Sequence, residues 1–167
     1  GANKYLIQRH TLKIIGKAVA EITIDQALQQ GIQAHEAGQV QDAARNYAAI
    51  LKAQPKHPDA NHNMGVLFVG VEKVREALPL FKTALEVNPS KAQFWISYID
   101  TLIRLDRLTD AKIALDQAKN RGATGDRFDQ LGLRIKEALG EQLEISKKSL
   151  GDTNWEPNIL DSLNLEQ

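Results

Sequence analysis

The sequence predicts an all-α protein in which helix hairpins stack into an α-solenoid of three units, with a capping helix at the N-terminal end and another at the C-terminal end. Two observations predict this fold. Small and large apolar residues recur at a constant spacing, as from Gly31 to Gly65, and each repeat contains two segments of helical periodicity separated by a short turn. A single hairpin would leave one apolar face in water, so about three stacked units are needed for stability.

The repeat is visible when the sequence is aligned with itself at the spacing of the two glycines. Six columns then agree: Gly31 with Gly65; Ala43 with Ala77 and Ala111; Tyr47 with Phe81 and Leu115; Ile50 with Ala84 and Ala118; Leu51 with Leu85; Pro55 with Pro89. The small residues allow two helix axes to cross closely, and we expect the large column to fill the gap toward the next unit. Agreement of so many columns at one period exceeds what composition alone produces.

Glycine and proline divide the repeats into helices. Gly38 ends the first helix, and Pro58 suits the first turn of the third, where its missing N–H costs nothing. The expected units are 24–57, 58–91 and 92–123, and their helices are 24–37, 40–53, 58–70, 74–87, 92–105 and 108–121.

Three segments flank the repeats. Residues 124–140 are expected to form a C-terminal capping helix, because apolar residues from Phe128 to Leu139 recur at helical spacing. Residues 1–23 read as a basic N-terminal helix or arm, with four cationic residues and no acidic one among the first 20. Residues 141–167 read as an irregular acidic tail, rich in turn residues around Gly151.

Composition excludes several classes of protein. The 167 residues, enough for one domain, include 21 Lys and Arg against 21 Asp and Glu, and this balance argues against a nucleic-acid partner. The absence of cysteine excludes disulfides, a thiolate nucleophile and cysteine-ligated zinc. No apolar run is long enough to span a bilayer, and no secretion signal is recognisable, which favours a cytoplasmic protein. No nucleotide-binding or hydrolase motif is present, so we expect neither an enzyme nor a cofactor.

Period, pairing and column chemistry together resemble the tetratricopeptide repeat (TPR) family over residues 24–123. The second unit is most similar, with Gly65, Phe68, Ala77, Phe81, Ala84 and Pro89 at the signature positions of the family. The third unit departs from the pattern, with Ile99 in the small column and Leu115 in the aromatic column. The resemblance implies a right-handed solenoid whose first helices line a concave groove that binds an extended peptide or another protein segment.

Thirteen residues would face that groove by repeat position. They are Leu28, Gln29, Ile32, His35, His62, Asn63, Val66, Val69, Ile96, Ser97, Asp100, Ile103 and Arg104. Asn63 lies where several peptide-binding members of the family have an asparagine, whose amide can both donate to and accept from a peptide backbone. The alternative is that the aliphatic members only pack neighbouring first helices together.

Two more specific sites are not expected. The family's clamp for acidic chaperone C-termini resembles a cradle of lysine, asparagine and arginine, but this chain has Leu28, Ile32, Asp59 and Gln93 at the corresponding positions. His57, Asp59 and His62 offer metal-ligating atoms, yet their spacing matches no established zinc motif. We therefore interpret the latter residues as the polar first turn of a helix and expect no bound metal.

The resulting hypothesis is a non-catalytic scaffold that mediates protein–protein interaction through its concave groove. Two alternatives remain open. Residues 54–104 also resemble TPR segments that precede a bacterial glycosyl-, sulfo- or methyltransferase domain, so the chain could be the recruiting module of a larger enzyme. It could instead be a self-assembling scaffold, a homo-oligomer formed through residues 1–20 or 141–167. We expect no membrane contact, because the moderate apolar face of the basic N-terminal segment is ordinary for a capping helix.

Overall fold

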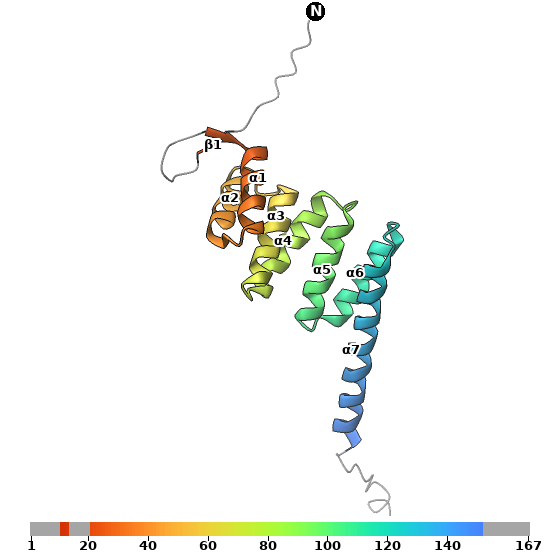
Figure 1. Cartoon of the computed structure of the whole chain (residues 1–167). Helices are drawn as coiled ribbons and strands as arrows, with labels where there is room; N and C mark the ends of the chain where they lie inside the picture. The colour runs from red at the N-terminus through yellow and green to blue at the C-terminus, as the bar shows by residue number, and fades with distance from the viewer. Residues whose placement is uncertain (1–10, 14–20, 152–167) are drawn as a thin grey trace, which may run out of the picture.

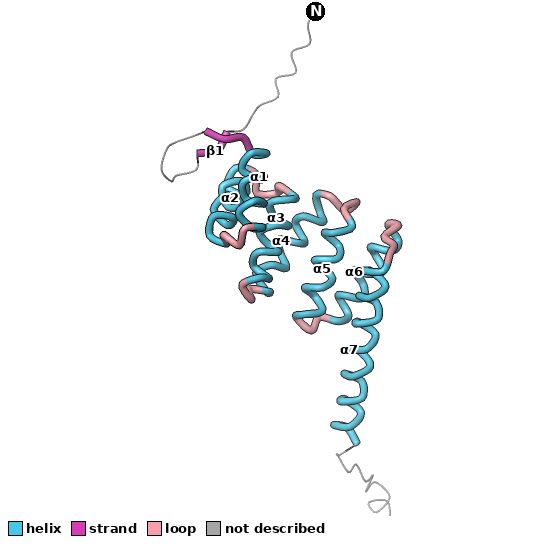
Figure 2. Tube along the Cα trace, in the orientation of Figure 1, coloured by secondary structure: helices cyan, strands magenta, loops and turns pink. Residues whose placement is uncertain are grey.

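The computed structural model of the chain describes residues 11–13 and 21–151 and consists of consecutive helix hairpins arranged side by side (Figures 1 and 2). Its seven helices within these ranges are α1 (Ile24–Glu36), α2 (Val40–Ala53), α3 (Pro58–Gly70), α4 (Val74–Val87), α5 (Ala92–Arg104), α6 (Leu108–Asn120) and α7 (Asp126–Gly151). The first six coincide with the predicted segments to within one residue at each end. The all-α solenoid of three hairpins is therefore confirmed, and no strand lies within the repeats.

A glycine under an aromatic ring holds each of the first two hairpins together. A Cβ atom at Gly31 would lie 2.5 Å from Cε1 of Tyr47, and a Cβ atom at Gly65 would lie 2.7 Å from Cε1 of Phe81. Both rings are almost completely buried. The large column therefore closes its own hairpin, in addition to any contact with the next unit, because only glycine leaves room for the ring.

The turns inside the hairpins repeat one backbone conformation. Gly38, Glu72 and Asp106 occupy equivalent positions and all have positive φ, at 70°, 61° and 57°. Only Gly38 adopts this left-handed conformation without steric cost, because it has no Cβ. The second and third hairpins therefore turn through a strained residue where the first has a glycine.

The turns between units are fixed by side-chain hydrogen bonds to a proline carbonyl. Nδ2 of Asn61 donates to the oxygen of Pro55 at 2.9 Å, and Nε1 of Trp95 donates to the oxygen of Pro89 at 2.8 Å. The two donors occupy the same repeat position, as do the two prolines. Two chemically different side chains thus satisfy the same backbone group.

The N-terminal end differs from the expected capping helix. Residues Thr11–Lys13 form strand β1, which pairs antiparallel with strand β2 (Glu21–Thr23), Leu12 lying opposite Ile22. The two strands contact α1 and α2 and so cover this end of the array. Thr23 then caps α1 by accepting from the N–H of Gln26, whose side chain accepts from the N–H of Thr23. The other residues of segment 1–20 lie outside the described part of the chain.

The C-terminal helix is longer than predicted. Helix α7 continues through Gly140 as far as Gly151, so the expected irregular tail is wrong for residues 141–151. Its first half packs against α5 and α6 through Phe128, Leu131 and Ile135, which belong to the core of the third unit. Its second half projects beyond the hairpins (Figure 1). Residues 152–167 of the predicted tail lie outside the described residues.

Candidate functional site

The contacts between helices identify the inner side of the array. Helix α1 contacts α3, α3 contacts α5, and α5 contacts α7, whereas α2, α4 and α6 make no comparable contacts with one another among the described residues. The first helices of the units are therefore closer together than the second helices, so the array bends toward the first helices. Their free faces form the shorter, inner side, which we call the inner face.

The thirteen predicted groove residues divide into three groups by exposure. Gln29, Val66 and Arg104 are exposed, and His62 is buried. The other nine are partly buried: Leu28, Ile32, His35, Asn63, Val69, Ile96, Ser97, Asp100 and Ile103. The set is thus a mixture of surface residues and residues of the joints between units.

One repeat position belongs to the joints. Leu28, His62 and Ile96 are equivalent in the three units; Leu28 and Ile96 pack against the core clusters, and His62 is only 7% exposed. Ile103, at another position, also packs against the core of the third unit. The placement of His62 on the groove surface is therefore wrong, because the side chain fills the joint between α3 and α5.

His62 is held between aromatic rings and polar partners. Its ring stacks on Phe94 with centroids 4.8 Å apart, and Phe81 lies at 5.4 Å on a tilted plane. Nε2 lies 2.9 Å from Oγ of Ser97, and Nδ1 lies 3.3 Å from Oδ1 of Asn63. Burial lowers the pKa of His62, and the hydrogen bond with Asn63 offsets only part of that effect. The neutral imidazole is therefore the form that suits this joint.

Asn63 lies beside His62 at the junction of the first two units. Burial raises the pKa of the Tyr47 hydroxyl, and the neighbouring Asn63 amide lowers it in part. That hydroxyl is itself buried and has no hydrogen-bond partner among the described residues. The hydroxyl therefore lies near Asn63 without a hydrogen bond of ordinary geometry to it.

Three aliphatic side chains of the inner face take no part in the core clusters. Ile32 of α1 and Val66 and Val69 of α3 remain partly or largely exposed, Val66 at 36%. Ile32 and Val66 are equivalent in the first two units, and Val69 lies one turn further along α3. They provide an apolar strip that the packing of the units does not use.

The third unit places a carboxylate where the first two place an aliphatic side chain. Asp100 is equivalent to Ile32 and Val66; it accepts from Nε of Arg104 at 2.8 Å and from Nη1 of Arg134 at 2.6 Å. Burial raises the pKa of Asp100, but the two arginines outweigh this effect and hold the pKa below its ordinary value. Sequence reasoning missed Arg134, which follows Asp100 at the repeat spacing but lies in the capping helix.

The histidine–aspartate string has a different local explanation for each residue. Nδ1 of His57 accepts from the N–H of Ala60 and so caps α3, and Asp59 pairs at 2.5 Å with Lys91, the residue that precedes α5. His62 faces the joint instead. No group of three potential metal ligands occurs in the described ranges 11–13 and 21–151.

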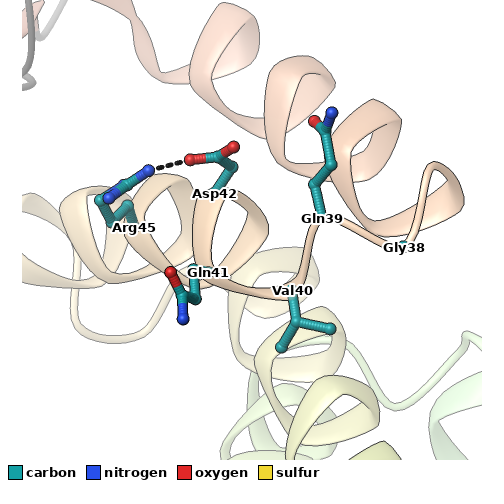
Figure 3. A pocket seen from close by; sticks show the side chains of 6 residues that line it. All are labelled: Gly38, Gln39, Val40, Gln41, Asp42 and Arg45. Carbon is teal, nitrogen blue, oxygen red and sulfur yellow. Dashed lines mark hydrogen bonds and ion pairs between the residues drawn. The ribbon is translucent and has the colours of Figure 1, made fainter.

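Two surface hollows of about 380 Å³ lie outside the inner face. One, at the turn between α1 and α2, is bordered by Asp42 and Arg45, which pair with each other, while Val40 points elsewhere (Figure 3). The other is lined by Arg75, Leu78, Leu105 and Arg107, and Arg107 is paired with Asp110. Neither brings unpaired reactive groups together, so neither is a candidate catalytic site. None of the described helices has the length and apolar character needed to cross a membrane.

Comparisons with known proteins agree with this architecture. A family model described as "Tetratricopeptide repeat" matches residues 68–132, whereas a search of curated proteins found no match to the sequence. Among solved structures, the TPR2B domain of yeast Sti1 in a complex with pHsp70 has a TM-score of 0.63 at 18% identity and covers 68% of this chain and 96% of that chain.

Two further structures are similar to the same extent. The first TPR of Spaghetti (RPAP3), bound to the HSP90 peptide SRMEEVD, has a TM-score of 0.65 at 17% identity, covering 70% of this chain and 93% of that chain. The Sgt2 TPR domain of Aspergillus fumigatus has a TM-score of 0.65 at 16% identity, covering 72% and 82%. At such low identity these likenesses establish the fold.

Proposed function

We propose that this chain, whose residues 68–132 match the tetratricopeptide repeat model and whose fold is that of TPR domains, is a non-catalytic scaffold that holds an extended segment of a partner protein on its inner face. The repeats supply a rigid surface made of first helices. The proposal covers the class of partner, a polypeptide, and the surface used.

The observation that supports this function best is the apolar strip of Ile32, Val66 and Val69. Side chains that stack the units are already provided by Leu28 and Ile96, so the strip is not needed for packing. Apolar surface on the inner side of a solenoid is typical of a binding site for another chain. Asn63 beside the strip adds a polar group that can bond to a peptide backbone.

The inner face also suggests the composition of the bound segment. Apolar side chains would lie on the first two units, along the strip. Polar or acidic side chains would lie on the third unit, where Arg104 and Arg134 share a single carboxylate and keep unused N–H donors. We expect an amphipathic peptide with its apolar part toward α1.

Chaperone tails are not the expected partner. The TPR of Spaghetti was solved with the peptide SRMEEVD, whereas this chain carries Leu28, Ile32 and Asp59 at positions where a carboxylate clamp needs cationic and amide groups. We expect no measurable binding of SRMEEVD in a fluorescence titration. If SRMEEVD bound saturably and Asn63→Ala abolished that binding, the inner face would still be the binding surface, but the exclusion of chaperone tails would be wrong.

The test of the function is a peptide array probed with the full chain and with two matched variants. Val66→Glu places a charge in the apolar strip, and Val87→Glu places the same charge on the outer helix α4, where Val87 is 46% exposed. Binding should be lost in Val66→Glu and in Asn63→Ala but kept in Val87→Glu, with helicity equal in all by circular dichroism. Equal binding by Val66→Glu and the unchanged protein would refute the inner face as the site.

A further inference from the structure

A chain of side-chain hydrogen bonds runs from the third unit to the second along the inner face. Nε2 of Gln93 lies 3.3 Å from Oγ of Ser97, and the same oxygen lies 2.9 Å from Nε2 of His62. On the other side of the ring, Nδ1 of His62 lies 3.3 Å from Oδ1 of Asn63. Four side chains from α5 and α3 are thus connected in one sequence.

The donor in each bond follows from the last member. Oδ1 of Asn63 can only accept, so Nδ1 of His62 carries a proton and donates to it. Nε2 of the neutral imidazole is then the acceptor, so the Ser97 hydroxyl donates to Nε2 while its oxygen accepts from the amide nitrogen of Gln93. The bond with His62 takes one of the two lone pairs of the Asn63 oxygen.

From this order of donors we propose that His62 is a positioning residue that holds the oxygen of Asn63 and leaves its N–H groups for the ligand, so that the inner face between α1 and α3 takes a backbone carbonyl of the bound peptide. The inference rests on the proposed function and makes it more specific. An asparagine with both groups free could pair with an N–H as well as a carbonyl. With its oxygen turned toward His62, Asn63 offers its N–H groups to a ligand in preference to its oxygen.

A buried hydroxyl lies at the same place. The Tyr47 hydroxyl is near enough to Asn63 for the amide to lower the pKa of Tyr47, but it makes no hydrogen bond of ordinary geometry with a described residue. Because a hydroxyl can both donate and accept, Tyr47 does not by itself select the group of the ligand.

The positions of the imidazole protons test the proposal without any ligand. In a long-range ¹H–¹⁵N correlation spectrum of the full chain at neutral pH, His62 should carry its proton on Nδ1. His57 is an internal control that should carry its proton on the other ring nitrogen. Its Nδ1 accepts from the N–H of Ala60, so its proton must lie on Nε2. A spectrum in which His62 is protonated on Nε2 would overturn the order of donors and the proposal with it.

A substitution tests whether Asn63 determines the proton position. In Asn63→Leu the acceptor at Nδ1 is removed, so the His62 proton should move to Nε2 and point toward Ser97, while the His57 signals stay unchanged. If His62 kept its proton on Nδ1 in this variant, Asn63 would not be the partner of that proton. The wild-type spectrum alone decides the proposal if the variant does not fold.

Paired analogues of the strongest array peptide test the ligand chemistry. An ester in place of one backbone amide weakens the carbonyl acceptor and removes the N–H, whereas N-methylation removes only the N–H. At the residue that contacts Asn63, the ester should weaken binding about tenfold, the loss of one hydrogen bond, and N-methylation should not. Equal losses from both changes would refute Asn63 as a donor to a carbonyl of the peptide. If no array peptide binds, the proposed function fails, but the proton position of His62 is still decided.

Discussion

Replacement of Gly65 by alanine tests the packing of a glycine under an aromatic ring in each hairpin. In a helix, alanine is normally more favourable than glycine by about 1 kcal/mol. At position 65 the new Cβ would lie 2.7, 2.9 and 3.0 Å from three ring atoms of Phe81. Ordinary carbon contacts lie at roughly 3.5–4.0 Å, so either the ring or the helix must move by nearly 1 Å.

The ring has little freedom to move, because Phe81 is 1% exposed and enclosed by the second hairpin. Overpacking of this kind costs about 1–3 kcal/mol. Since the better helix propensity of alanine offsets about 1 kcal/mol of this cost, we expect Gly65→Ala to lower the free energy of unfolding by up to about 2 kcal/mol. Gly70→Ala is a matched control in the same helix, since nothing lies within 4 Å of a Cβ at Gly70, and it should raise the free energy of unfolding by up to about 1 kcal/mol.

Urea unfolding followed by circular dichroism measures both changes. The decisive quantity is the difference between the two variants, expected at about 1–3 kcal/mol, because the gain in helix propensity is common to both and only the packing cost differs. The double variant Gly65→Ala, Phe81→Leu should be more stable than the sum of its single changes by about 0.5–3 kcal/mol, because a smaller side chain makes room for the methyl group. If Gly65→Ala and Gly70→Ala were equally stable, the ring would not be packed on Gly65.

Three other predictions follow from the backbone and the joints. Glu72→Gly should raise the free energy of unfolding by about 1 kcal/mol, since it removes a side chain from a left-handed turn, and Gly38→Ala should lower it; both are measurable in urea. The free energy of unfolding should fall as the pH drops below about 6.5, the ordinary pKa of histidine, because His62 binds a proton in the unfolded chain before it does so in the folded chain. The fall should level off below the lowered pKa of His62 in the folded chain. Urea midpoints that did not change between pH 7.5 and 5 would contradict this prediction. Trp95→Phe should cost about 1 kcal/mol through the lost hydrogen bond to Pro89, seen as a lower thermal midpoint with unchanged helicity.

The helices of the repeats could be predicted almost to the residue because their ends depend on local chemistry. Glycine at position 38 and proline at positions 55, 58 and 89 interrupt the apolar periodicity, and the repeat supplies the same boundary two or three times. A boundary that is ambiguous in one unit is thus fixed by its equivalent in another. The fold class needed no information beyond these patterns.

The two ends could not be predicted in the same way. The pairing of Leu12 with Ile22 depends on a contact between two short strands, and each strand alone is too short to show a period of two. Gly140 suggested the end of a helix, but a helical glycine costs only about 1 kcal/mol. Contacts beyond it, between Gln142 and Asp106 and between Glu144 and Lys147, accompany the longer helix.

The candidate site was predicted by repeat position, and its errors also follow repeat position. Leu28 and Ile96, which stand at the position equivalent to His62, are both apolar, and this would have indicated that His62 lies in a joint. When a polar residue stands at a mostly apolar repeat position, the sequence alone does not show whether its side chain is buried or exposed. Burial requires hydrogen-bond partners within reach, such as Ser97 for His62.

The third unit shows how the solenoid tolerates departures from its own pattern. Ile99 replaces the small residue and Leu115 replaces the aromatic ring, and both are buried in the core of that unit. One side chain is larger and the other smaller than its equivalent, so the space between the helices stays filled. The same exchange should be possible in the second unit: Gly65→Ile combined with Phe81→Leu should fold, whereas Gly65→Ile alone should not. A folded single variant would show that the two positions vary independently, and the packing argument for the repeat would then be wrong.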